Sequence, residues 1–317
     1  MPKKIQFIFN TSELGAGTFG ASLGPFAIQT AARKLKNDLF GKYDIQKIED
    51  KNYLLDIPTS FTFAKRIDAF KEIAVSVSQK VSNAIKNSTF PLIISGDHSC
   101  GAFTIAGIRK AFPDKRLGVI WIDAHGDIHS PFTTPSGNLH GMPLALALGQ
   151  DNIEAQKNNP DELTLKYWNE FKNYAGVSPM IQPEDLVYVG VRDTEKEEDF
   201  LINKLGIRNI RVEEVRKNGV QETLSEINML LKSCDIFYVS LDVDSMDPDE
   251  TSYGTGTPVK NGLTAKEVKH LLIGLAQDIR MTCIEFVEIN PCLDNKINKM
   301  AEISFELIES IVKTIES

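Results

Sequence analysis

The strongest constraint on the fold is an alternation of short apolar runs with longer amphipathic stretches along the whole chain. Several of the runs are apolar almost throughout, which is typical of strands covered on both faces in a parallel sheet. Seven runs rich in β-branched residues predict strands at Lys4–Phe9, Pro91–Ile94, Gly118–Ile122, Leu186–Val191, Ile207–Arg211, Ile236–Leu241 and Ile284–Ile289.

The segments between these runs place apolar residues every three or four positions, as on one face of a helix. The longest such stretch follows Ser60, a candidate N-cap, and continues to Ile85, while shorter ones cover 224–231 and 300–315. No linker, low-complexity tract or fixed repeat interrupts the 317 residues. We therefore expect a single domain over residues 1–317, with a three-layer α/β/α architecture and a mostly parallel central sheet.

Composition excludes several classes of function. The 35 Lys and Arg residues against 43 Asp and Glu give a formal net charge of −8, which disfavours binding to nucleic acid or to an anionic membrane. No apolar run reaches the ~18 residues of a membrane span, and the start MPKKIQFIFN lacks the apolar core of a signal peptide. The four cysteines form no C-x-x-C pair, so we expect reduced, packed thiols in a cytoplasmic protein.

Imidazole and carboxylate side chains follow three of the predicted strands directly. SGDHS, with His98, follows the first of the three, DAHGDIH begins at Asp123 after the second, and SLDVDSMDP runs from Ser240 to Pro248 at the third. In extended chain, residues i, i+2 and i+4 point to the same side. The side chains of Asp123, His125 and Asp127 can therefore converge on one point. Those of Asp242 and Asp244 can do the same.

Charge balance indicates which kind of ion this cluster would bind. Four aspartates and two neutral imidazoles would balance two divalent cations, and a donor set rich in oxygen without thiolate suits Mn(II) better than structural zinc. Taken alone, a D-x-D segment is often a turn and a single histidine is often a packed core residue. The three motifs together predict a dinuclear metal site.

In that order, SGDHS, DAHGDIH and SLDVDSMDP resemble the signature motifs of the ureohydrolases, the family of arginases and agmatinases. The resemblance extends over nearly the whole chain. Four further segments resemble the arginase branch most closely: GAGTFGASLGP, SPFTTPSGNLHGMPLA (130–145), GTGTPV and EFVEINP.

The resemblance implies two Mn(II) ions per chain. One would be held by His98, Asp123, Asp127 and Asp242, and the other by His125, Asp123, Asp242 and Asp244. A hydroxide bridging the two ions would attack the guanidinium carbon of L-arginine, giving L-ornithine and urea. It also implies a homo-oligomer, a trimer or a hexamer.

The same resemblance implies roles for residues around the metals. Asp127 would also hydrogen-bond the hydroxide, Glu288 would pair with the guanidinium group, and His140 would pass a proton to the leaving amine. Thr257 would contact the guanidinium region. The substrate's amino acid end would meet His129, Ser136 and Asn138 at the carboxylate, and Glu195 and Glu198 at the α-amino group.

Two departures from the arginase pattern leave the substrate open. His129 stands where arginases usually carry asparagine, and Glu195 replaces an aspartate. The alternatives are a ureohydrolase acting on agmatine, guanidinobutyrate or a related guanidino acid, a single-zinc deacetylase of similar architecture, and a scaffold without catalysis. Asp97 and Asp247 are expected to serve as turn or supporting residues, and His270 as a solvated helix residue.

Overall fold

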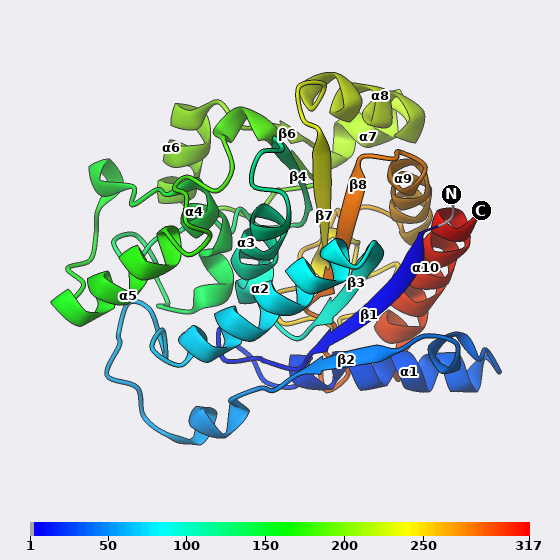
Figure 1. Ribbon diagram of the computed structural model, residues 1–317, viewed down its shortest axis with the longest axis horizontal. Coiled ribbons are helices and arrows are strands. Elements are labelled where there is room, and N and C mark those ends of the chain that lie inside the picture. The colour runs from blue at the N-terminus through cyan, green and yellow to red at the C-terminus, as the bar shows by residue number, and fades with distance from the viewer. Residues whose placement is uncertain (1–2) are drawn as a thin grey trace.

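In the computed structural model, which describes residues 3–317, the apolar runs form one sheet of eight strands whose neighbours are all parallel (Figure 1). The strands are β1 (Lys4–Asn10), β2 (Ile45–Ile48), β3 (Thr89–Ser95), β4 (Leu117–Ile122), β5 (Leu186–Val189), β6 (Arg208–Ile210), β7 (Ile236–Asp242) and β8 (Met281–Val287). Across the sheet their order is β2-β1-β3-β8-β7-β4-β5-β6.

Helices connect the strands, because parallel neighbours can be joined only by a crossover. They are α1 (Gly24–Lys34), α2 (Phe70–Lys86), α3 (Gly101–Ala111), α4 (Pro143–Leu148), α5 (Glu162–Lys172), α6 (Lys196–Leu205), α7 (Val212–Asn218), α8 (Val220–Leu230), α9 (Ala265–Ala276) and α10 (Lys299–Glu316). None of the helices in residues 3–317 has both the length and the apolar character needed to cross a bilayer.

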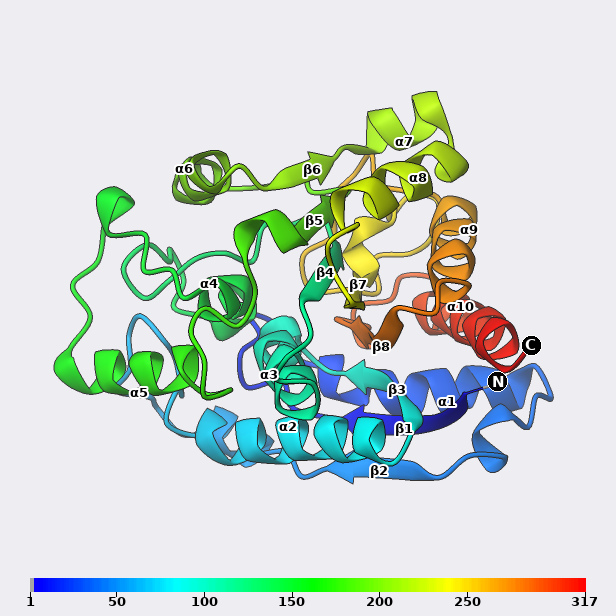
Figure 2. The same ribbon diagram turned by 45° about the horizontal axis from the view of Figure 1, so that its top comes forward.

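The helices form two layers with the sheet between them, so the expected three-layer architecture is confirmed (Figure 2). One apolar core joins the sheet to α1 and α7–α10, and the other joins it to α2–α6. Adjacent residues of β1 divide between the two cores: Phe7 and Phe9 pack in the first and Ile8 in the second. This burial on both faces explains why the strands read as nearly continuous apolar runs.

Three expectations from the sequence were wrong in detail. The edge strand β2 was missed, since it is short and only Ile48 of its four residues is buried. The helix expected after Ser60 begins at Phe70. Ile67 is buried as the spacing implied and Phe63 is half-buried, but the backbone there forms turns, with Arg66 at a φ of 58°. All four cysteines are free, but Cys292 is exposed rather than packed.

The strand order determines where the site forms. The motifs after β3, β4 and β7 and the segment after β8 all leave the carboxyl edge of four adjacent central strands, β3-β8-β7-β4. In parallel sheets this edge is the usual position of a ligand site.

The packing of α3 on α2 gives a test of the fold. A methyl group on Gly107 of α3 would lie 2.8 Å from the Ser78 carbonyl oxygen and 2.8 Å from the Val81 Cβ. We expect Gly107→Ala to lower the free energy of unfolding by about 1–2 kcal/mol. Overpacking against a fixed backbone outweighs the gain of ~1 kcal/mol in helix propensity. Gly41→Ala is the control, because no atom lies within 4 Å of its added methyl group. Thermal unfolding would contradict the packing if both variants matched the wild type.

Candidate functional site

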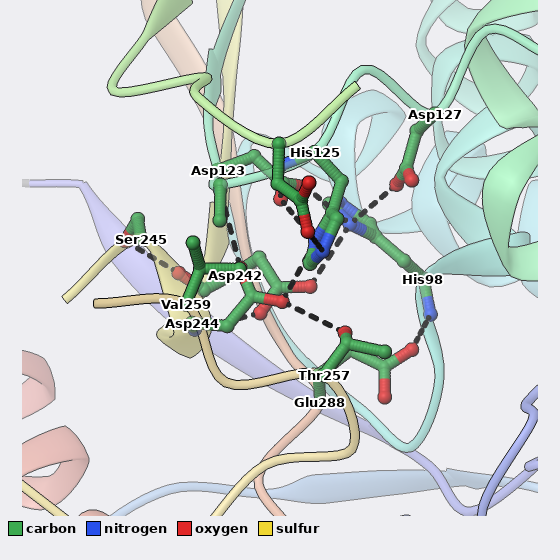
Figure 3. A network of polar contacts seen from close by, with 12 residues as sticks. His98, Asp123, His125, Asp127, Asp242, Asp244, Ser245, Thr257, Val259 and Glu288 are labelled. Carbon is green, nitrogen blue, oxygen red and sulfur yellow. Dashed lines mark hydrogen bonds and ion pairs between the residues drawn. The ribbon is translucent and has the colours of Figure 1, made fainter. Parts of the chain in front are cut away.

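The site begins where β3, β7, β4 and β8 end. His98 lies three residues beyond β3, Asp123 directly follows β4, Asp242 is the last residue of β7, and Glu288 directly follows β8. Four strand ends that are far apart in sequence therefore bring the polar motifs to one point (Figure 3).

His98 is fixed in orientation by the residues around it. The turn that carries it is held by Asp97, whose carboxylate accepts from the backbone N–H groups of Ser99 and Gly15, both at 2.8 Å. The imidazole stacks on the Trp121 indole with 4.0 Å between ring centroids and 5° between planes. Its Nε2 lies 2.7 Å from the Ser240 hydroxyl, so Nδ1 faces the opposite way, toward the aspartates.

Behind Ser240 lies a buried polar group that sequence reasoning missed. The Tyr238 hydroxyl, two residues earlier on β7, donates to Glu285 Oε2 at 2.7 Å, and the Ser95 hydroxyl donates to Glu285 Oε1 at 2.5 Å. Glu285 and Ser240 are both fully buried. Polar residues inside otherwise apolar strands were the signal available in the sequence for this group.

Two overlapping groups of potential metal ligands meet in front of His98. In the first, His98 Nδ1 lies 3.0 Å from Asp123 Oδ2, 3.0 Å from Asp127 Oδ2 and 3.4 Å from Asp242 Oδ2. In the second, His125 Nδ1 lies 3.0 Å from Asp244 Oδ2 and 3.6 Å from Asp123 Oδ1. The two oxygens of Asp123 thus face different groups, as a bridging carboxylate would (Figure 3).

The residues present fit a pair of cations. His98 Nδ1 and Asp123 Oδ2 are buried, and within residues 3–317 neither has a hydrogen-bond partner. Their 3.0 Å separation is that of neighbouring ligands about 2.1 Å from one divalent ion. In the same range, the only ion-pair partners of the four aspartates are histidines. Uncompensated buried carboxylates cost several kcal/mol each, so the cluster requires positive charge.

The pKa values in the cluster also indicate that it requires positive charge. Burial, followed by the charge of Asp123, raises the pKa of Asp127 to about 6. Burial and the charges of Asp244 and Asp123 raise the pKa of Asp242 well above its usual value. Burial opposes a charge on His98, but its carboxylate partners outweigh that effect and raise its pKa. The protein alone therefore retains protons here that a bound cation would displace.

Two site residues occupy the left-handed backbone region, which residues other than glycine seldom adopt. Asp127 has a φ of 50° and Glu288 a φ of 63°. Asp127 is held by its carbonyl, which accepts from the Leu144 N–H at 3.0 Å, and Glu288 by its N–H, which donates to the Gly96 carbonyl at 2.8 Å. Strain of this kind is concentrated at functional positions.

His140 and Glu288 form a pair beside the metal ligands. His140 Nδ1 lies 3.3 Å from Glu288 Oε1, which also accepts from the His98 backbone N–H at 3.0 Å. Burial disfavours the imidazolium, but the Glu288 carboxylate outweighs it and raises the pKa of His140 to about 9. His140 is therefore protonated at neutral pH.

A cavity of about 460 Å³ extends from the ligand groups to the surface. Its inner wall includes His98, His125, Asp127, Asp242 and Thr257, whose hydroxyl donates to Asp244 Oδ2 at 3.1 Å. Other residues of its wall from the sequence motifs are His129, Ser136, Asn138, His140, Glu195 and Glu198. Glu288 is 3% exposed and lies behind this wall, in contact with His140 and His98.

A histidine contacts both acids at the acidic end of the cavity. His129 Nε2 lies 2.9 Å from Glu195 Oε2 and 3.6 Å from Glu198 Oε2, and its Nδ1 lies 3.1 Å from the Thr133 hydroxyl. The His129 hydrogen bond lowers the pKa of Glu195 to about 2. Glu195 and Glu198 also form the capping box at the start of α6. These two acids therefore stabilise the helix besides facing the cavity.

Other residues singled out in the sequence lie apart from the ligand groups. His270 is exposed on α9, and Asp247 stabilises a turn by accepting from the Asp249 N–H at 2.9 Å. Sequence reasoning missed Asp193, Thr134 and Pro258, which also line the cavity, because no metal-ligand spacing marks them.

Comparison with known proteins agrees with this geometry. The family model described as the arginase family matches residues 7–313. Arginase of Bacillus subtilis (strain 168) is 33% identical, with 98% of each chain covered. The solved structure of arginase from Bacillus caldovelox has a TM-score of 0.79 at 33% identity, again covering 98% of each chain. That of Entamoeba histolytica arginase in complex with L-ornithine has a TM-score of 0.80 at 26% identity, with 98% of this chain and 99% of that chain covered.

The family model matches nearly the whole chain, and curated arginases are more than 30% identical to it. These matches agree with the three strand-end motifs and the two overlapping ligand groups. The chain therefore belongs to the arginase family.

Proposed function

We propose that the protein is a manganese-dependent arginase that hydrolyses L-arginine to L-ornithine and urea. The observation that carries the proposal is the pair of ligand groups sharing Asp123 at the inner end of an acidic cavity. The B. subtilis and B. caldovelox relatives, both named arginase, support the same activity.

Two Mn(II) ions would occupy the ligand groups. One would be bound by His98, Asp123, Asp127 and Asp242, and the other by His125, Asp123, Asp242 and Asp244. The oxygen-rich donor set supports Mn(II) over a structural zinc ion, and the four aspartate charges match two divalent cations. When bound, such ions lower the pKa of water and make hydroxide available near neutral pH.

The cavity would hold the substrate by both of its ends. The carboxylates at the inner wall would attract the guanidinium group, with Asp127 accepting a hydrogen bond from the attacking water and Thr257 close to the guanidinium nitrogens. Glu195 and Glu198 would accept from the α-ammonium group. Ser136 and Asn138 would donate to the α-carboxylate, and His129 would join them by giving up its contact with Glu195 or Thr133. Fixing both ends orients the guanidinium carbon for attack.

Proton transfer to the leaving amine would fall to His140. Its pKa of about 9 keeps the imidazole protonated at neutral pH, so it can act as a general acid. Glu288, 3.3 Å from His140 Nδ1, stabilises the imidazolium and holds the ring in place. Because Glu288 is 3% exposed and does not line the cavity, any pairing with the guanidinium group would require its carboxylate to move toward the cavity.

A second candidate is a ureohydrolase acting on another guanidino compound, such as agmatine or guanidinobutyrate. The observation that favours it is the ion pair between His129 and Glu195, which engages one of the two acids expected to bind an α-ammonium group.

A cytoplasmic location is also part of the proposal. All four cysteines are free, and Cys100, Cys234 and Cys283 are buried, as in proteins of reducing compartments.

The first test is urea release from L-arginine, agmatine and guanidinobutyrate with Mn(II) present. We expect L-arginine to have the highest kcat/KM, and Asp127→Asn to lower it by roughly 10²–10⁴-fold, because the amide removes the negative charge and one of the two acceptor oxygens. Asp249→Asn, an exposed aspartate outside the cavity, is the matched control. A higher kcat/KM for agmatine or guanidinobutyrate would replace the arginase assignment with the second candidate.

His140→Ala tests the proton donor. We expect kcat to fall by roughly 10²–10⁴-fold with a much smaller change in KM. Because the acid form of His140 is required, wild-type kcat should decline as the pH rises through about 9, and this decline should vanish in the variant. A pH profile with the same alkaline limb in both proteins would assign the donor role to another group.

Removal of metal should show how much the buried aspartates destabilise the metal-free protein. Folded Asp127 retains its proton up to about pH 6, whereas an unfolded aspartate loses it near 3.8, so the metal-free fold loses stability as the pH rises between these values. Bound Mn(II) would compensate the negative charges of the deprotonated buried aspartates. We therefore expect Mn(II) to raise the Tm of chelator-treated protein more at pH 8 than at pH 5, as measured by thermal unfolding. Equal shifts at both pH values would contradict this account.

A further inference from the structure

The charges around the cavity do not favour the carboxylate of an amino acid substrate. Five carboxylates line the cavity, those of Asp127, Asp193, Glu195, Glu198 and Asp242, and no lysine or arginine does so within residues 3–317. This field attracts a guanidinium or ammonium group but repels a carboxylate. A substrate that carries a carboxylate therefore needs positive charge at that end.

Lys65 lies directly behind the loop where the carboxylate would bind. Its Nζ donates to Asn138 Oδ1 at 3.0 Å, and its backbone N–H donates to the Gly137 carbonyl at 2.7 Å. Among residues 3–317, no carboxylate lies within ion-pair distance of Lys65, whereas Lys51 and Lys71 each have such a partner. Its charge is therefore uncompensated beside the cavity.

The contact with Lys65 determines how Asn138 faces the cavity. An ammonium group only donates hydrogen bonds, so the amide oxygen must be the atom that faces Lys65. The NH₂ group then points the other way, and within the described chain it donates to no acceptor. Asn138, which lines the cavity, thus presents a donor with a neighbouring positive charge.

The loop around Asn138 is held in a single position. Gly137 has a φ of 76°, and a Cβ atom there would lie 2.1 Å from the Thr62 carbonyl oxygen, so this segment rests closely on residues 62–65. The Ser136 hydroxyl accepts from the Asn138 N–H at 3.1 Å, which leaves its own hydrogen free to donate. Two donors, one from Ser136 and one from Asn138, are consequently aligned at the same end of the cavity.

A second half-buried cation near the cavity, Arg192, does not fill this role. Arg192 donates to the backbone carbonyls of Val259 and Asp244, at 2.7 and 2.9 Å, on the side of the metal ligands. Its guanidinium group is committed to main-chain oxygens, whereas Lys65 acts through a side chain of the cavity wall.

We propose that Lys65 is a specificity-determining residue that selects guanidino substrates bearing a carboxylate over their decarboxylated or neutral counterparts. It orients the Asn138 amide and offsets the acidic field at that end of the cavity. This inference rests on the proposed ureohydrolase function and deepens it. Lys65 is a positioning residue, because it acts through Asn138.

The test compares L-arginine with L-argininamide, in which a neutral amide replaces the carboxylate, in wild-type protein and in Lys65→Met. The methionine keeps most of the side-chain length and removes the charge. We expect kcat/KM for L-arginine to fall about tenfold, chiefly through KM, because a charge-assisted contact is lost. The value for L-argininamide, or its Ki as a competitive inhibitor, should change less than about twofold.

Two further variants complete the design. Lys65→Arg retains the charge and should restore most of the preference for L-arginine. Lys71→Met, at an exposed lysine paired with Glu170, should match the wild type. An equal loss for both compounds, or no loss for either, would overturn the role of Lys65. Wild-type turnover of L-arginine separately tests the proposed function, so the two failures are distinguishable.

Discussion

The structure depends above all on the burial of four aspartates at one edge of the sheet. Asp123, Asp127, Asp242 and Asp244 are each at most 7% exposed, and in the described chain their ion-pair partners are histidines only. Such a cluster folds stably only with positive charge supplied from outside, or with protons retained at raised pKa values. The surrounding residues hold these groups in position. His98 stacks on Trp121 and contacts the Ser240 hydroxyl, and the backbone is strained at Asp127 and Glu288.

Much of the fold could be predicted because buried parallel strands have a clear signature. Every predicted strand exists, with ends displaced by a few residues at most, since uninterrupted apolar runs leave few other structures possible. The order of the strands across the sheet could not be predicted from the sequence. β3 and β4 are consecutive in the chain, yet β8 and β7 lie between them, and this insertion is what brings Asp242 and Asp244 beside Asp123. Helical spacing also failed after Ser60, because turns can bury the same apolar positions as a helix.

The site shows a similar division between what is local and what is not. The three motifs could be found because each places its groups within a few residues, at a strand end where side chains alternate. Ser240, Glu285 and Lys65 could not be assigned in this way. Ser240 contacts His98 across 142 positions, Ser95 contacts Glu285 across 190, and Lys65 contacts Asn138 across 73. Residues that orient other residues leave no spacing pattern, because their partners are determined by the tertiary fold.

Two groups of residues at the cavity differ in what they imply about the substrate: the acids Glu195 and Glu198, and Asn138 with Lys65 behind it. Glu195 and Glu198 complete a capping box at α6, so the helix alone would explain an acidic pair at this position. The helix cap therefore accounts for both acids without an α-ammonium group, and His129 is already paired to Glu195. The pairing of Lys65 with Asn138 has no such structural explanation. In the described fold the Asn138 NH₂ group donates to no acceptor, and the Lys65 ammonium donates to Asn138 but has no carboxylate partner. We therefore expect the residues proposed to bind the carboxylate, rather than the acidic pair, to discriminate between an amino acid and an amine.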